Sequence, residues 1–157
     1  GVQTCALPIF REENIFRVRG ELDPNVEVKS YSDLLRKELK IKNGLPYFDL
    51  IILGLGDDGR TASLFPHEFK SFKNENNCVV ATHPSSGQKR ISLSEKIINN
   101  AKEVIFHVTG SNKKTVIDEI ISKKDNFANY PATYIEPISK NLSWYLDFDA
   151  ADKLINE

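Results

Sequence analysis

Residues 48–66 read Phe-Asp-Leu-Ile-Ile-Leu-Gly-Leu-Gly-Asp-Asp-Gly-Arg-Thr-Ala-Ser-Leu-Phe-Pro, and this stretch decides the fold. The apolar run that ends at Leu53 predicts a buried strand over 48–53, and a glycine-rich turn follows it directly. Residues 61–65 then predict the start of a short helix. A strand, a glycine turn and a helix N-terminus together indicate an anion-binding site. Glycine lets the backbone approach a ligand, and the first turn of a helix has free N–H donors.

The rest of the chain alternates short apolar strands with amphipathic helices. We expect further strands over 78–81, 90–93, 104–108 and 142–146. We expect helices over 28–39, over 94–100 with Ser94 as the cap, after a cap at Ser111, and from Asp147 or Asp149 to Leu154. Residues 131–137 are expected to be irregular or to form one helical turn. This order predicts an α/β domain with a Rossmann-like, mainly parallel sheet and flanking helices.

Composition narrows the classes of function. The chain has 157 residues, with 21 basic and 22 acidic side chains and a net charge of −1. A nearly neutral chain has no global attraction to nucleic acid or to an anionic membrane, and no apolar stretch is long enough to span a bilayer. Cys5 and Cys78 show no metal-binding or redox spacing, which favours a reducing compartment. We therefore expect a cytoplasmic enzyme or binding domain.

The first nine residues are interpreted separately. The sequence Gly-Val-Gln-Thr-Cys-Ala-Leu-Pro-Ile resembles the translation of a widely used sequencing adapter. We therefore hypothesise that residues 1–9 are assembly read-through and that residues 10–157 are the C-terminal portion of a single domain. Native coding sequence that continues upstream from Phe10 into Gly1 would contradict this hypothesis.

The glycine turn alone leaves several interpretations open. Gly54, Gly56 and Gly59 satisfy the G-x-G-x-x-G template for dinucleotide binding. That template also needs an acidic residue at the end of the next strand, but residues 82–84 are Thr-His-Pro. A turn that serves only strand–helix packing is a second interpretation. A site for a phosphorylated small molecule is the third, and we favour it.

Residues 49–66 resemble the signature of the 6-phosphogluconolactonase family, Gly-x-Gly-x-Asp-Gly-His-x-x-Ser-Leu-Phe-Pro. Three further segments match that family in order. They are Arg-Ile-Ser-Leu from Arg90, Thr-Gly-Ser-Asn-Lys ending at Lys113, and a C-terminal portion that comprises Tyr-Pro-Ala at 130–132 and Trp-Tyr-Leu-Asp at 144–147. The resemblance implies hydrolysis of 6-phospho-D-glucono-1,5-lactone in the oxidative pentose phosphate pathway, with no cofactor or metal and with a small phosphosugar as the partner. The family's chains are longer at the N-terminus, so the resemblance also implies a missing N-terminal part.

The resemblance assigns roles to individual residues. Asp58 occupies the position of the aspartate that orients the catalytic base. The backbone N–H groups around Gly56 and Gly59 would hold the developing oxyanion, with Gly54 in the same loop. Arg90 and Lys113 would bind the substrate phosphate, arginine through its planar fork and lysine as a point charge.

Position 60 departs from the family pattern, because the family has histidine there and this chain has Arg60. A guanidinium stays protonated in proteins and cannot accept a proton from water. Three explanations compete: a sequencing error, an impaired homologue, or a base displaced to another residue. The candidates for a displaced base are His67, His83 at a strand end, and His107, for which we expect packing within the sheet. None has metal-ligand spacing with another His, Cys or carboxylate.

Two alternative functions remain open. Glucosamine-6-phosphate deaminases and isomerases share the broad fold, but they have Phe-Asn-Glu-Pro where this chain has Ser-Leu-Phe-Pro at 63–66, so the acid they need is absent. A non-catalytic phosphosugar-binding homologue is the other alternative, in which Arg60 adds a positive charge to an anion site.

Overall fold

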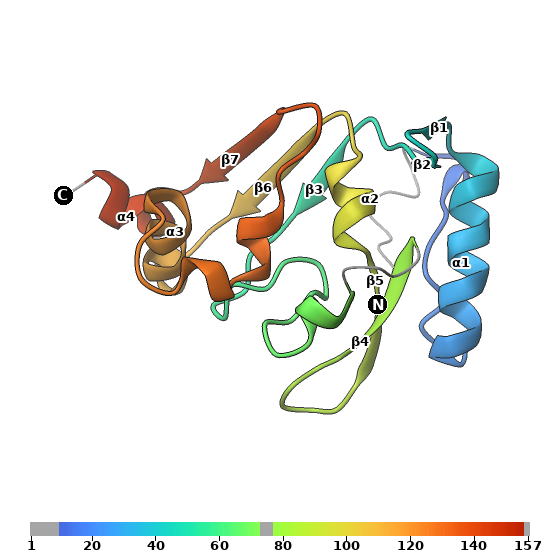
Figure 1. The fold of residues 1–157 in the computed structure, drawn as a ribbon, viewed down its shortest axis with the longest axis horizontal. Helices are drawn as coiled ribbons and strands as arrows, with labels where there is room; N and C mark the ends of the chain where they lie inside the picture. Colours follow the sequence, from blue (N-terminus) through green and yellow to red (C-terminus); the bar gives the residue numbers. More distant parts are fainter. Residues whose placement is uncertain (1–9, 73–76, 156–157) are drawn as a thin grey trace.

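The computed structural model describes residues 10–72 and 77–155, so residues 1–9 and most of the polar segment 74–77 lie outside the described part. Three parallel strands form the central sheet: β3 (Ile51–Leu53), β6 (Val104–Val108) and β7 (Leu142–Leu146), in the order β3-β6-β7 (Figure 1). Ile52 lies opposite Ile105, and His107 lies opposite Tyr145. The prediction of an α/β chain with a parallel sheet is therefore confirmed.

One face of this sheet carries the hydrophobic core. Ile51 and Leu53 alternate with the exposed Ile52, and Phe106 is fully buried between its neighbours on β6. Phe106 stacks on Trp144 of β7 with ring centroids 4.0 Å apart. The helices α2 (Glu95–Asn99) and α3 (Lys114–Ser122) supply buried side chains to the same cluster, as does the 3₁₀ turn η6 (Pro131–Tyr134). In Figure 1, α2 and α3 lie on the viewer's side of the sheet.

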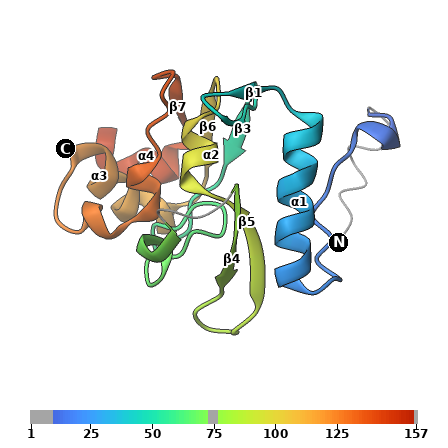
Figure 2. The same cartoon turned by 45° about the vertical axis from the view of Figure 1, so that its right-hand side comes forward.

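The strands expected over 78–81 and 90–93 exist but do not join the parallel sheet. β4 (Cys78–Thr82) and β5 (Lys89–Leu93) form a separate antiparallel pair, in which Arg90 lies opposite Ala81. The helix α1 (Pro24–Glu38) packs on this hairpin, as Figure 2 shows. A small ladder of β1 (Ile41–Lys42) and β2 (Leu45–Pro46) follows α1. The short connection over residues 83–88 explains the antiparallel pairing, because a parallel pair needs a long crossover.

The helix ends differ from the expectation at three points. α1 begins four residues earlier than predicted, because Asp23 caps it: Asp23 Oδ1 accepts from the backbone N–H groups of Asn25 and Val26. Ser94 is the N-cap residue of α2, as predicted, but its side chain makes no capping bond. The expected cap at Ser111 is wrong, because the 3₁₀ turn η4 (Ser111–Lys113) precedes α3 and Lys113 is the N-cap residue of that helix. The last helix, α4 (Phe148–Ile155), starts directly after Asp147, as predicted.

The helix expected over 61–65 is absent. Residues 61–64 form a tight turn closed by a bridge between Thr61 and Leu64, and Ala62 has a positive φ of 49°. A left-handed residue at the second position interrupts helical geometry. The next helical turn in this region is the 3₁₀ helix η3 (Phe69–Phe72), and the segment from Gly54 to Leu64 is therefore a loop. Across the described residues, the structure contains no helix that is long and apolar enough to cross a membrane.

Candidate active site

The glycine turn after β3 is a closed loop held by its own backbone. Gly56 N–H donates to the carbonyl of Arg60 at 2.8 Å, and Gly59 N–H donates to the carbonyl of Gly56 at 3.1 Å. Thr61 is buried, and its hydroxyl donates to the carbonyl of Gly54 at 2.9 Å. These bonds join the two ends of the loop, so residues 54–61 form one compact unit at the carboxyl end of β3.

The same bonds narrow the choice among the predicted oxyanion donors, the N–H groups around Gly56 and Gly59. The N–H groups of Gly56 and Gly59 are already used inside the loop, and no helix N-terminus follows them. Within residues 10–72 and 77–155, the backbone N–H groups of Asp57 and Asp58 have no acceptor. They lie in the same turn, between Gly56 and Gly59, and can donate to a ligand oxygen.

Asp58 and Arg60 are bound to each other at the tip of this loop. Asp58 Oδ1 accepts the backbone N–H of Arg60 at 3.1 Å, and Asp58 Oδ2 accepts from Arg60 Nη1 at 3.3 Å. Both side chains are about one-third exposed, so the pair faces solvent. The Arg60 guanidinium also lies 5.5 Å from the ring centroid of Phe65, which is fully buried. The carboxylate that would orient a histidine therefore binds a permanent cation.

Glycine at position 56 is a requirement of this arrangement. A Cβ at Gly56 would overlap Asp58 Oδ1 and would lie 2.6 Å from Cγ of Arg60. Any side chain there would push the Asp58–Arg60 pair apart. Gly54, in contrast, has open space around a built Cβ, and its carbonyl accepts the hydroxyl of Thr61.

Arg90 lies on the face of β5 that is directed toward this loop. The backbone N–H of Ser63 donates to Ser92 Oγ at 3.1 Å, which joins β5 to the residues that follow Arg60. Side chains two residues apart on a strand share a face, so Arg90 projects on the same side as Ser92. Arg90 is half-buried, and its Nε donates to Gln88 at 3.4 Å.

Lys113 lies at the same edge of the sheet as the glycine loop. β3 and β6 run parallel, so the turn after Val108 and the turn after Leu53 both follow carboxyl ends of strands. Gly110 has a φ of 96°, and its N–H donates to both carboxylate oxygens of Asp147 at 3.1 and 3.0 Å. The Lys113 side chain is half-buried and has no partner among the described residues. It is free to bind a ligand.

The three histidines differ as substitutes for the base. His83 Nδ1 accepts the backbone N–H groups of Ser85 and Ser86 at 3.3 and 3.2 Å, so that nitrogen is not available to take a proton from water. The His83 ring also packs edge-on against the Phe65 ring, with ring centroids 5.4 Å apart. His67 Nε2 lies 3.8 Å from Glu68 Oε2. His107 is exposed on β6, so its predicted packing within the sheet is wrong.

Tyr130 is a residue of this region to which the sequence analysis gave no role. Its ring lies against the position of Gly59, and the N–H of Ala132 donates to the carbonyl of Gly59 at 3.2 Å. The Tyr130 hydroxyl donates to Glu119 of α3 at 2.5 Å, which together with burial raises the pKa of Tyr130 to about 12. The Tyr-Pro-Ala match was the signal that could have identified it.

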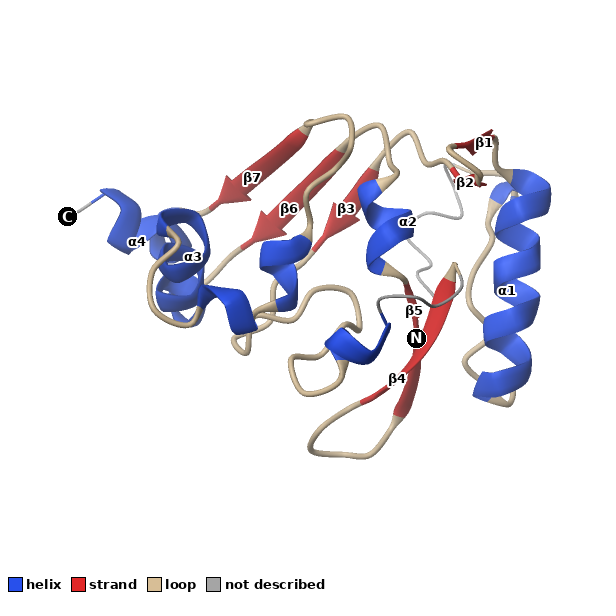
Figure 3. Cartoon of the chain, viewed as in Figure 1, coloured by secondary structure: helices blue, strands red, loops and turns tan. Residues whose placement is uncertain are grey.

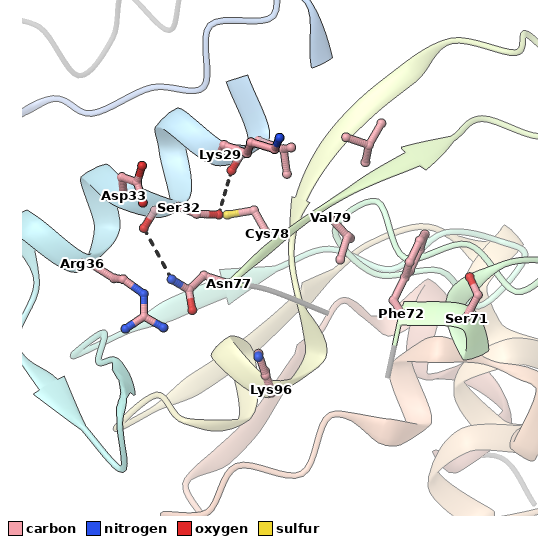
Figure 4. A pocket seen from close by; sticks show the side chains of 12 residues that line it. Lys29, Ser32, Asp33, Arg36, Ser71, Phe72, Asn77, Cys78, Val79 and Lys96 are labelled. Atoms are coloured by element: carbon pink, nitrogen blue, oxygen red, sulfur yellow. Dashed lines mark hydrogen bonds between the residues drawn. The ribbon is translucent and has the colours of Figure 1, made fainter. Parts of the chain in front are cut away.

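The described residues hold no cluster of three or more His, Cys, Asp and Glu side chains that could bind a metal. A pocket of about 660 Å³ lies elsewhere, between α1 and β4, and none of the predicted site residues lines it (Figure 4). Cys78 faces Ser32 there, and burial raises the pKa of its thiol to about 11, so Cys78 is not a nucleophile at neutral pH.

The fold and the loop define a class of protein. An acidic residue on a glycine loop and two cations sit around the carboxyl edge of a parallel sheet, where open α/β proteins bind their ligands. This is an α/β protein with a parallel sheet, and its glycine loop lies at the sheet edge where such proteins bind ligands.

Comparisons with known proteins identify the family. A sequence model of the glucosamine-6-phosphate isomerases/6-phosphogluconolactonase family matches residues 3–144, and the chain belongs to that family. It is 45% identical over 142 residues to the 6-phosphogluconolactonase of Aggregatibacter actinomycetemcomitans, which is 90% of this chain and 59% of that protein. It is also 45% identical over 135 residues to the 6-phosphogluconolactonase of Haemophilus influenzae. This match covers 86% of this chain and 56% of that protein.

Solved structures agree with these relatives. The crystal structure of devB protein superposes with a TM-score of 0.85 at 37% identity, over 92% of this chain and 60% of that one. The Trypanosoma brucei 6-phosphogluconolactonase superposes with a TM-score of 0.72 at 29% identity. The superposition covers 83% of this chain and 54% of that one. The chain therefore spans slightly more than half of the length of the relatives that it matches.

Proposed function

We propose that this chain is part of a 6-phosphogluconolactonase, which hydrolyses 6-phospho-D-glucono-1,5-lactone to 6-phosphogluconate in the oxidative pentose phosphate pathway. The observation that carries the proposal is the Asp58 loop at the carboxyl edge of a parallel sheet, in a chain 45% identical to relatives named for this activity. The buried free thiol of Cys78 favours a reducing compartment, so we propose the cytoplasm as its location.

The chemistry of the substrate fits the charges at this edge. The lactone carries a phosphate, and its hydrolysis creates a carboxylate. Lys113 and Arg90 are candidates to bind the phosphate, because a charge-assisted hydrogen bond is stronger than a neutral one. Lys113 follows the carboxyl end of the strand next to β3, and β5, which carries Arg90, is hydrogen-bonded to Ser63. The N–H groups of Asp57 and Asp58 are candidates to bind the carbonyl oxygen as it becomes negative.

Hydrolysis also needs a group that takes a proton from water. Water attacks C1 of the lactone, the C1–O5 bond breaks, and O5 leaves with a proton as a hydroxyl group. A histidine at position 60, oriented by Asp58, would serve as this base. Arg60 cannot, and its ion pair with Asp58 occupies the carboxylate. This favours the second candidate, a homologue that binds the phosphosugar and hydrolyses it poorly.

Binding of the product tests the proposed site without requiring activity. Calorimetric titration with 6-phosphogluconate is expected to show binding that weakens about 10-fold or more in Lys113→Ala and in Arg90→Ala, the loss of one charged hydrogen bond. Lys102→Ala is the matched control, since Lys102 is exposed and precedes β6 at the opposite edge of the sheet. Equal affinity in all four proteins would contradict the assignment of these cations.

A further inference from the structure

The imidazole of His83 is held at the tip of the β4–β5 hairpin through one of its two ring nitrogens. His83 Nδ1 accepts the backbone N–H groups of Ser85 and Ser86 at 3.3 and 3.2 Å. A ring nitrogen that accepts hydrogen bonds carries no proton, so the proton of the neutral ring lies on Nε2. Figure 3 shows the loop that carries this turn in tan, between β4 and β5 at the bottom of the view. The turn therefore fixes Nε2 of His83 as a donor.

The described part of the chain makes no use of this donor. Among residues 10–72 and 77–155, the contacts of the His83 ring are the two bonds at Nδ1 and an edge-on contact with Phe65. The side chain is half-buried, and no carboxylate pairs with it. The N–H at Nε2 is therefore available to an oxygen of a ligand.

His83 lies on the same face of the hairpin as Arg90. Ala81 and Arg90 lie opposite each other in the β4–β5 register, so their side chains share one face. The pairing continues past β4, since the N–H of His83 donates to the carbonyl of Gln88 at 2.9 Å. His83 follows Ala81 by two residues and therefore projects on that face. Diagonal neighbours on one face lie about 7–8 Å apart, so one small anion can contact both His83 and Arg90.

The ring of Phe65 joins this hairpin face to the Asp58 loop. The ring centroids of His83 and Phe65 lie 5.4 Å apart. The Arg60 guanidinium lies 5.5 Å from the centroid of the same ring, and Arg60 also binds Asp58. His83 and the loop tip thus pack on one buried aromatic ring. Phe65 connects the hairpin face of His83 and Arg90 with the proposed site.

We propose that His83 is a substrate-binding residue, and that its Nε2–H donates to an oxygen of the substrate phosphate beside Arg90. The proposal rests on the proposed function, because it concerns the same site. Phosphate oxygens carry negative charge and only accept hydrogen bonds, while Nε2–H only donates. Arg90 supplies a positive charge, and His83 adds a donor whose direction is set by the turn. A phosphate is therefore the group that this pair selects.

Two substitutions separate the nitrogen that serves the turn from the nitrogen that serves the ligand. In His83→Asn the side-chain oxygen can still accept the N–H groups of the turn, as asparagine does in such turns, but the shorter side chain does not reach the position of Nε2. His83→Gln does the reverse, because its amide N–H₂ lies about as far from the backbone as Nε2. Calorimetric titration with 6-phosphogluconate and with inorganic phosphate is expected to show about 10-fold weaker binding by His83→Asn and partial recovery in His83→Gln.

His67→Asn is the matched control. The His67 ring also lies near Phe65, with ring centroids 5.9 Å apart, but the side chain is exposed and its Nε2 lies 3.8 Å from Glu68. Its affinity for both ligands is expected to equal that of the parent chain. Equal affinity of His83→Asn and the parent chain, with weaker binding by Arg90→Ala, would overturn this inference and leave the proposed function intact. Absence of binding by the parent chain would overturn both.

A spectroscopic measurement on the parent chain needs no variant. Long-range ¹H–¹⁵N correlation spectra are expected to show that the proton of the neutral His83 ring is on Nε2. The Nε2 resonance is then expected to shift as inorganic phosphate is added, while the resonances of His67 stay in place. A proton on Nδ1, or an Nε2 resonance that does not respond to phosphate, would contradict the proposal.

Discussion

The ring of Tyr130 occupies the space that a side chain at Gly59 would need. A Cβ built on Gly59 would overlap the Tyr130 ring and would lie 2.6 Å from Cβ of Tyr130, and Gly59 has a φ of 75°. The glycine loop is thus seated on a residue that lies 71 positions later in the chain. A hydrogen bond from the N–H of Ala132 to the carbonyl of Gly59 holds the loop against the Tyr130 segment.

Gly59→Ala is expected to destabilise the chain by about 2–4 kcal/mol, because a left-handed alanine and an overpacked contact both cost free energy. Gly44→Ala is a matched control: Gly44 also has a φ of 75°, but nothing lies within 4 Å of its built Cβ. It is expected to cost only the backbone strain, about 1–2 kcal/mol. Urea unfolding measures both values. Equal losses in the two variants would show that the Tyr130 contact contributes nothing.

The hydrogen bond from Tyr130 to Glu119 makes a pH-dependent contribution. It raises the pKa of Tyr130 in the folded chain to about 12, above its ordinary value of 10.0. A raised folded pKa means stability that is complete below pH 10 and is lost as the pH rises toward 12. Tyr130→Phe removes this group, so the stability of the variant is expected to fall less steeply over that range. Urea unfolding at several pH values measures the difference, and parallel curves for the two proteins would contradict it.

The buried Glu27 depends on Arg19. Only 1% of the Glu27 side chain is exposed, and it accepts the Arg19 backbone N–H at 2.9 Å and its Nε at 3.0 Å. Burial alone would raise the pKa of Glu27, but the hydrogen bonds from Arg19 outweigh burial and lower it. Arg19→Ala is expected to cost about 2–4 kcal/mol at pH 7, because a buried carboxylate loses its partners.

Arg17→Ala is the control for that change. The side chains of Arg17 and Glu21 are each 57% exposed, so removal of this ion pair is expected to leave the free energy of unfolding nearly unchanged. A lowered folded pKa gives stability that is present at neutral pH and is lost as the pH falls through that pKa. The difference in free energy of unfolding between Arg19→Ala and the parent chain is therefore expected to become smaller in acid. Chemical denaturation at pH 7 and below pH 4 measures this difference, and a value that does not change with pH would argue against an ionised Glu27.

Asp147 joins the turn after β6 to the start of α4. Its carboxylate accepts the N–H of Gly110 and, at 2.8 Å, the N–H of Ala150. Asp147→Ala is expected to cost about 1–2 kcal/mol, as the loss of a helix cap does, and to weaken binding of 6-phosphogluconate by loosening the turn that carries Lys113. Asp149→Ala, in the first turn of α4, is expected to change neither property. Unfolding and calorimetric titration of both variants measure the two effects together.

The parallel strands could be predicted from the sequence because their signal is local. The apolar runs at 104–108 and 142–146 are as long as the strands they form. The helix predicted over 61–65 failed for a different reason. The bridge from Thr61 to Leu64 and the left-handed Ala62 belong to a loop geometry that no residue type in that segment requires.

Pairing between strands was not encoded in periodicity either. The pattern over 78–81 and 90–93 predicts two strands, but it does not show that they pair with each other instead of with β3 or β6. The wrong prediction for His107 has a similar cause. Its neighbours Phe106 and Val108 are buried, so alternation places His107 on the uncovered face, and a sequence does not show which face is covered.

The sequence predicts candidate site residues, whose roles stay predictions, but it does not predict the hydrogen bonds among them. The motif resemblance selected Asp58, Arg90 and Lys113, and the structure puts Asp58 and Lys113 at one sheet edge, with the face of β5 that carries Arg90 directed toward the Asp58 loop. The internal use of the Gly56 and Gly59 N–H groups depends on how the loop closes, which the spacing of glycines does not specify.

The central claim is that the Asp58 loop is a lactonase site in which a histidine at position 60 would supply the base that Arg60 cannot supply. The direct test measures acid release from 6-phospho-D-glucono-1,5-lactone, above spontaneous hydrolysis, for the chain and for Arg60→His. We predict that Arg60→His is at least about 100-fold faster than the chain with Arg60, the size of a general-base contribution. We also predict that its rate rises with pH as the imidazole loses its proton. Equal rates in the two proteins, or no hydrolysis by either while both bind 6-phosphogluconate, would contradict the claim.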